Sequence, residues 1–186
     1  MLEARIQRQL FEASDLLAQG AGSWAPTLAE ASQLLWDCIS GGGKLLAAGG
    51  QGAGRWMARW LVSNLAGTFE RPRPPMAALA LDRQPPASMA GQLQALAQAG
   101  DLLLVVEAGD ACDELLALVA MAHEAGVSAL VLTGPETTRW AAALDETDLL
   151  IAVPHERPAR VAEVHLLLLH VLCDAVDLQL MGDNES

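Results

Sequence analysis

A glycine-rich stretch at residues 49–54, with the sequence GGQGAG, is the first place in this chain that could perform chemistry. An apolar run precedes it, and the residues after it have the composition of a helix. Glycines permit a tight turn, and the backbone N–H groups at the start of a helix attract anions. The stretch therefore has the outline of a phosphate-binding loop. The same glycines would also suit a strand-to-helix turn without a ligand, so the pattern leaves both interpretations open.

A second loop follows the apolar run at residues 102–106 and contains two carboxylates, Glu107 and Asp110. A negative charge about 4 Å from such a carboxylate is repelled by about 1 kcal/mol in water, and by several kcal/mol when partly buried. We therefore expect this loop to reject a dianionic phosphate. Asp110 has a structural alternative, because it precedes a helix predicted to start near Ala111 and would cap that helix.

Aromatic and imidazole side chains supply further candidates. Trp56 and Trp60 are four residues apart, so they lie on one face of the helix predicted at residues 53–66. We interpret them as packing residues, as residues that fill a ligand site, or as a partner surface. His165 and His170 are five residues apart and do not share a helical face well, and we expect both to be core or interface histidines.

Apolar runs alternate with helical patterns along most of the chain. Helices are predicted at residues 2–19, 25–40, 53–66, 88–98, 111–125, 137–144 and 158–180. Strands are predicted at residues 44–49, 76–81, 102–106, 129–133 and 149–153. Strands that alternate with helices form a parallel sheet covered on both faces. We therefore predict one α/β domain over residues 1–186, a doubly wound five-stranded sheet, with N-terminal helices at 1–40 and an oligomerisation helix at 158–181.

Composition and charge exclude several classes of protein. The net charge of −12 would repel a nucleic acid, so we expect no direct nucleic-acid partner. Apolar runs stay below the roughly 18 residues of a membrane span, and the N-terminus lacks the pattern of a signal peptide. The three scattered cysteines form no CxxC pair, which predicts a cytoplasmic protein with no metal, cofactor or disulfide.

The last predicted helix, at residues 158–180, is apolar almost all the way round. Such a helix is buried on several sides, and only one side can face the sheet of a small domain. Large exposed apolar patches are rare on monomers, so we expect the other sides to contact a second subunit. The chain should therefore form a homo-oligomer.

Six segments, in order and with their spacing, carry a resemblance to a known family. They are RIQRQLFEAS (5–14), GGQGAG (49–54), FERP (69–72), ALAQAGDLLLVV (95–106), ALVLTG (129–134) and ARVAEVHLLLLHVLCDAVD (159–177). The chain resembles sugar isomerase (SIS) domains, and among them the phosphoheptose isomerases and the related initiator-associating protein DiaA. The resemblance implies an SIS fold, a homotetramer with terminal helices between subunits, and isomerisation of a phosphorylated sugar.

The resemblance also implies a site, from which this sequence departs. The implied phosphate loops are Gly50, Gln51, Gly52, Ala53 and Gly54, and Glu107, Ala108, Gly109, Asp110 and Ala111. The family's phosphate-binding serine corresponds to Gly54, and the second loop has no hydroxyl. The family's catalytic glutamate and histidine correspond to Asn64 and His170, and an amide takes no proton at neutral pH. A zinc site known in some relatives corresponds to Trp60, Asn64, Ala162 and His170, of which only His170 could bind zinc.

These replacements lead us to expect a non-catalytic protein, a pseudoenzyme that binds the replication initiator DnaA as a tetramer and acts in DNA replication initiation. Candidate contact residues are Trp56, Trp60, Leu180 and Met181. Several alternatives stay open. The chain could be a phosphosugar-binding protein, or a phosphoheptose isomerase that acts on sedoheptulose 7-phosphate with Glu107 as its base. It could also be a sensor of a neutral or cationic sugar held by Glu107 and Asp110, or a scaffold for another partner.

Overall fold

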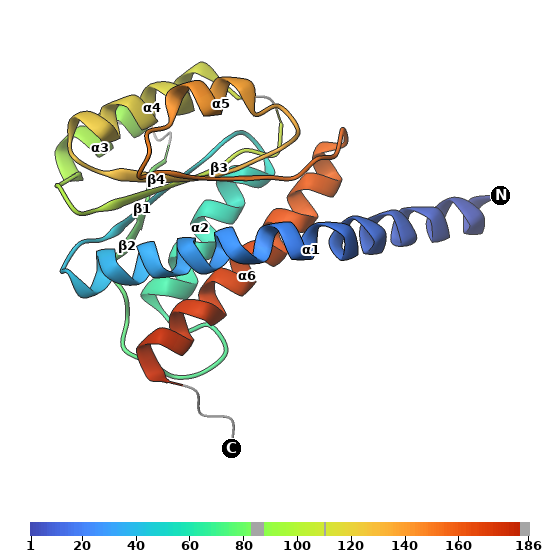
Figure 1. Ribbon diagram of the computed structural model, residues 1–186, viewed down its shortest axis with the longest axis horizontal. Coiled ribbons are helices and arrows are strands. Elements are labelled where there is room, and N and C mark those ends of the chain that lie inside the picture. The colour runs from blue at the N-terminus through green and yellow to red at the C-terminus, as the bar shows by residue number, and fades with distance from the viewer. Residues whose placement is uncertain (83–87, 110, 183–186) are drawn as a thin grey trace.

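Five parallel strands form one sheet in a computed structural model that describes residues 1–82, 88–109 and 111–182 (Figure 1). The strands are β1 (Leu45–Gly49), β2 (Ala78–Ala80), β3 (Leu102–Val106), β4 (Ser128–Thr133) and β5 (Leu149–Ala152). Their order across the sheet is β2-β1-β3-β4-β5, and every neighbouring pair is parallel. The predicted fold class, a doubly wound parallel sheet of five strands, is confirmed.

Helices cover both faces of this sheet (Figure 1). One face carries α3 (Met89–Leu96), α4 (Asp113–Glu124) and α5 (Thr138–Ala143). The other carries α1 (Leu2–Ser40), α2 (Ala53–Ala66) and α6 (Pro158–Met181). Successive strand side chains point to opposite faces, so β1, β3, β4 and β5 each contribute to two separate cores. This explains why the strands are apolar throughout instead of alternating with polar residues.

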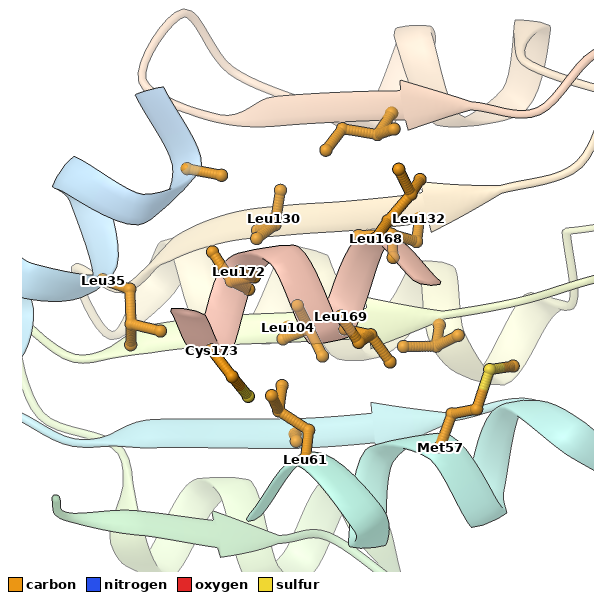
Figure 2. Close-up of a cluster of buried hydrophobic side chains, with 14 of the residues drawn as sticks. Leu35, Met57, Leu61, Leu104, Leu130, Leu132, Leu168, Leu169, Leu172 and Cys173 are labelled. Atoms are coloured by element: carbon orange, nitrogen blue, oxygen red, sulfur yellow. The ribbon is translucent and has the colours of Figure 1, made fainter. Parts of the chain in front are cut away.

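The core beneath α2 and α6 determines where these two helices lie. Figure 2 shows Met57 and Leu61 of α2 beside Leu169 of α6, above Leu104 of the sheet. All four side chains are fully or almost fully buried. Because α1 and α6 are also packed together, the three helices of this face form one layer.

The N-terminal region is one continuous helix, so the prediction of two helices, at residues 2–19 and 25–40, was wrong. Helix α1 spans 39 residues and contains Pro26 in its interior. A proline removes one helical hydrogen bond and normally breaks or kinks a helix. Here the indole of Trp24 lies over Gly20 and donates from Nε1 to the Ala152 carbonyl oxygen at 3.0 Å. These contacts hold the turn beside Pro26 against β5. They offset the stability that the helix loses through the hydrogen bond missing at the proline.

Smaller differences concern the ends of the elements. Strand β2 is three residues long, shorter than the predicted 76–81, and α4 begins at Asp113 instead of near Ala111. The N-cap of α4 is Cys112, so the helix does not start where a cap by Asp110 was predicted. Asp110 itself lies outside the described residues. Within those residues, no helix has the length and apolar character that crossing a bilayer demands.

His165 is a core residue of α6, in line with the sequence-based expectation. Its side chain has no exposed surface, and its Nε2 lies 3.0 Å from the Thr133 carbonyl oxygen. Its Nδ1 finds no hydrogen-bond partner among the residues that the structure describes. Burial lowers the pKa of His165 to about 4, against the weaker opposing effect of the Thr133 carbonyl. The imidazole is therefore neutral in the folded protein at pH 7.

This burial predicts a loss of stability in mild acid. The unfolded chain protonates His165 near pH 6.5, whereas the folded chain does so only near pH 4. The contribution of His165 is therefore complete above pH 6.5 and is lost as the pH falls towards 4, by about 3 kcal/mol in total. The free energy of urea unfolding, measured from pH 7.5 to 4.5, should fall more steeply for the wild type than for His165→Gln. Equal slopes for the two proteins would contradict this prediction.

Candidate functional site

The order of the strands defines a crevice where the two glycine-containing loops meet. The chain passes from β1 to β2 on one side and from β3 to β4 on the other, so the order reverses between β1 and β3. In open α/β sheets, ligands bind outside the carboxyl ends of the strands at such a reversal. Gly49 at the end of β1 is paired in register with Val106 at the end of β3. The loops that follow these residues are therefore neighbours.

The glycines of the first loop allow a close approach between backbones. A Cβ atom at Gly54 would overlap the Val106 carbonyl oxygen, and a Cβ atom at Gly49 would overlap the Gly54 carbonyl oxygen. Gly52 has a positive φ of 73° and is the N-cap of α2. The first turn of α2 therefore lies directly against the ends of β1 and β3. A side chain at Gly54 cannot be accommodated without a shift of the backbone.

Glu107 is an ionisable side chain that lies between the two loops. Its Oε1 accepts a hydrogen bond from the Gly109 N–H at 3.0 Å, and its side chain is largely buried. Its Oε2 occupies the place that a Cβ atom at Gly50 would need. The carboxylate of Glu107 thus lies against the first loop although it belongs to the second. A side chain at residue 50 would force this carboxylate to move.

The other predicted loop residues are divided between the surface and the interior. Gln51, Gly52 and Ala53 are exposed, whereas Ala108 and Ala111 are buried. The exposed residues belong to the turn in front of α2 and to its first position, where backbone N–H groups lack partners within the helix. The exposed residues of this set therefore belong to the first loop.

A second group of predicted residues lies further along α2, opposite α6. The indole ring of Trp60 and the imidazole of His170 have centroids 4.7 Å apart. Phe69 completes the group, with its ring centroid 5.8 Å from His170 and 6.2 Å from Trp60. Asn64 is one turn beyond Trp60, and its Nδ2 donates to the Trp60 carbonyl oxygen at 2.7 Å. The amide of Asn64 is thus used within its own helix.

The two tryptophans of α2 differ in their surroundings although they are one turn apart. Trp60 is half-buried against His170, whereas Trp56 is 52% exposed. Leu180 is half-buried and Met181 is exposed at the end of α6. Phe69, which had no predicted role, lies in the FERP segment. Its contacts with Trp60 and His170 depend on α2 and α6 lying side by side, which the sequence alone does not reveal.

Several known proteins are similar to this chain over its whole length. A protein named phosphoheptose isomerase from Methylibium petroleiphilum is 41% identical, and the alignment covers all of this chain and 98% of that relative. A protein of the same name from Azoarcus is 36% identical over 97% of this chain and 98% of the relative. No family model matches the chain.

Solved structures agree with these relatives. A phosphoheptose isomerase from Francisella tularensis superposes with a TM-score of 0.88 at 26% identity, covering 95% of this chain and 98% of the other. The phosphoheptose isomerase from Neisseria gonorrhoeae gives a TM-score of 0.86 at 28% identity, with 95% and 99% covered.

These comparisons overturn the main functional hypothesis from the sequence. We had expected a non-catalytic pseudoenzyme that binds DnaA, because hydroxyls and a glutamate of the resembled pattern are replaced. The relatives and structures above carry the name of an enzyme, and none of them is named for binding DnaA. The hypothesis was wrong because it took replaced residues at a few positions as evidence of lost catalysis and gave them more weight than the similarity over the whole chain.

The close approach at Gly54 predicts that restoring a serine there is costly. Gly54→Ser would place its Cβ on the Val106 carbonyl oxygen, so the variant should lose about 1–3 kcal/mol of stability. Gly22→Ser is the matched control, because a Cβ atom at Gly22 meets no other atom within 4 Å. Urea unfolding of both variants measures the difference. A Gly54→Ser protein as stable as the wild type would contradict this description of the loop.

Proposed function

This chain belongs to the phosphoheptose isomerase family, and we propose that it isomerises a phosphorylated heptose, with sedoheptulose 7-phosphate as the ketose. The observation that carries the proposal is the similarity to a protein of that name at 41% identity over the entire chain. The crevice between β1 and β3 is the site that we assign to the reaction, because it lies where the strand order reverses.

Binding of the phosphate is assigned to the first loop. Gln51, Gly52 and Ala53 are exposed immediately in front of and at the start of α2. Unpaired N–H groups and the positive end of the helix dipole favour an anion at such a place. The backbone can supply these donors without any hydroxyl side chain. The absence of serine from this loop therefore weakens the anion site without removing its backbone donors.

The proton transfer needs ionisable groups, because an aldose–ketose isomerisation moves a proton between adjacent carbons. Asn64 cannot take that proton, and its amide is hydrogen-bonded within α2. Glu107 lies between the two loops of the crevice and carries a carboxylate. We assign the role of base to Glu107, and that of a second acid–base group to His170 on α6.

Glu107→Gln tests the assigned base. Loss of the base should lower kcat for sedoheptulose 7-phosphate at least about 100-fold. KM should change much less, because the base acts at C1 and C2, several bonds away from the phosphate on C7. Steady-state kinetics, followed by NMR detection of the aldose product, measure both values.

The control is Asp113→Asn, which removes a charge from the exposed first turn of α4. Its kcat should equal that of the wild type. A wild-type protein without turnover would contradict the proposed function, and a kcat unaffected by Glu107→Gln would contradict the assigned base.

We also propose that the chain assembles with further copies of itself. The start of α1 projects beyond the sheet, and four apolar side chains on it are exposed, namely Leu2, Ile6, Leu10 and Phe11 (Figure 1). A groove of about 500 Å³ between α1 and α6 is lined mainly by apolar side chains, among them Leu28, Leu167 and Val171. A continuous helix cannot fold back into its own groove. Terminal helices of a second copy are therefore the occupant that we assign to it.

This assembly is tested by a charge placed in the groove. Val171 is exposed in the single chain, so Val171→Glu should leave the fold intact and break the oligomer into monomers of 19.6 kDa. Leu96→Glu is the matched control, because Leu96 is also exposed but lies on α3, on the opposite face of the sheet. Light scattering after gel filtration measures the mass. A monomeric wild type, or a Val171→Glu protein with unchanged mass, would contradict the proposal.

A further inference from the structure

We propose that Arg73 is a positioning residue that fastens the end of α2 to α6 and thereby holds His170 in its place beside Trp60. The inference rests on the proposed function, because it treats His170 as part of the reacting site. It concerns a residue that lies outside both loops of the crevice, in the connection between α2 and β2.

The Arg73 side chain is completely buried, and its N–H groups donate hydrogen bonds to two different elements. Its Nη1 donates to the Leu65 carbonyl oxygen at 2.9 Å and to the Gly67 carbonyl oxygen at 3.2 Å, and its Nη2 donates to the Asn64 carbonyl oxygen at 2.8 Å. Nη1 also donates to the Pro74 carbonyl oxygen at 3.1 Å. The last carbonyls of a helix lack partners within it and carry the negative end of its dipole. A guanidinium is therefore well suited to this end of α2.

The same guanidinium forms a buried ion pair with α6. Its Nε donates to Oδ1 of Asp177, whose side chain is only 2% exposed. The other carboxylate oxygen of Asp177 has no hydrogen-bond partner among the described residues. Charges buried in this way are strongly dependent on each other, because removal of one leaves the other uncompensated. Arg73 is thus a direct polar connection between the last turn of α2 and α6.

These contacts form a closed path that begins and ends on α6. From Asp177 the path runs through Arg73 to the Asn64 carbonyl, and the Asn64 amide donates to the Trp60 carbonyl oxygen. The Trp60 ring then contacts the ring of His170. His170 and Asp177 are seven residues apart, about two helical turns, so they lie on the same face of α6. Arg73 therefore fixes α2 and α6 close to the point where Trp60 meets His170.

The test uses the proton resonance of the His170 ring, which the nearby indole of Trp60 shifts by its ring current. The resonance is assigned by its loss in His170→Gln. Arg73→Lys keeps a charge beside Asp177 but cannot reach the three carbonyls at the end of α2, and Asp177→Asn removes the charge from α6. Both variants should lose the ring-current shift of His170. The resonance of His165, on the same helix, should stay in place because that ring is in the core.

Asp101→Asn is the matched control. Asp101 is a similarly buried carboxylate, with a side chain 2% exposed, and it pairs with Lys44 just before the first residues of β1 and β3. It should lower stability without moving the His170 resonance. If Asp177→Asn does not fold, the test is decided by Arg73→Lys, which retains the charge pair.

Kinetics supply a second readout. Misplacement of a reacting group lowers the rate more than it weakens binding, so Arg73→Lys should lower kcat about 100-fold and change KM by less than about twofold. A folded Arg73→Lys protein with an unmoved His170 resonance would overturn the proposal whatever its activity. A wild-type protein without turnover, combined with a displaced His170 resonance in the variant, would uphold the positioning role and refute only the proposed function.

Discussion

The contact between the first turn of α2 and the end of β3 is the constraint on which the rest of the site depends. It exists because Gly49 and Gly54 have no side chains, so the helix can start directly against the Val106 carbonyl. A longer side chain would push α2 away from the sheet. The helix would then lose its position over the crevice, and Trp60 would lose its position beside His170. The glycines here let the chain turn, and they also let α2 start close to the sheet.

Helix α2 connects the two halves of the site. It begins at the first loop, next to the Glu107 carboxylate, and ends where Arg73 fastens it to α6. One half of the site is polar and lies where the strand order reverses, and the other is an aromatic group around His170. Because both halves depend on a single helix of 14 residues, a displacement of one end of this helix would also move the other end. The buried ion pair with Asp177 and the glycine contact therefore serve the same purpose.

The sequence predicted the parallel sheet well, because apolar runs such as residues 102–106 are buried on both faces and have no other plausible state. It failed at Pro26, where a contact between Trp24 and β5, distant in sequence, outweighs a local helix-breaking preference. It also offered no role for Arg73, since nothing local reveals a partner 104 residues away. The inference of lost activity failed for a related reason. Replacement of residues at matching positions does not by itself show that the reaction is lost.

The most direct test of this account is a crystal structure of the protein with bound sedoheptulose 7-phosphate. We expect the phosphate to lie at the start of α2, against the backbone of residues 51–53. We also expect the sugar to extend towards Glu107, with His170 within hydrogen-bonding distance of the oxygens on the reacting carbons. A sugar bound away from the crevice between β1 and β3 would contradict the account, as would a crevice that stays empty at saturating ligand.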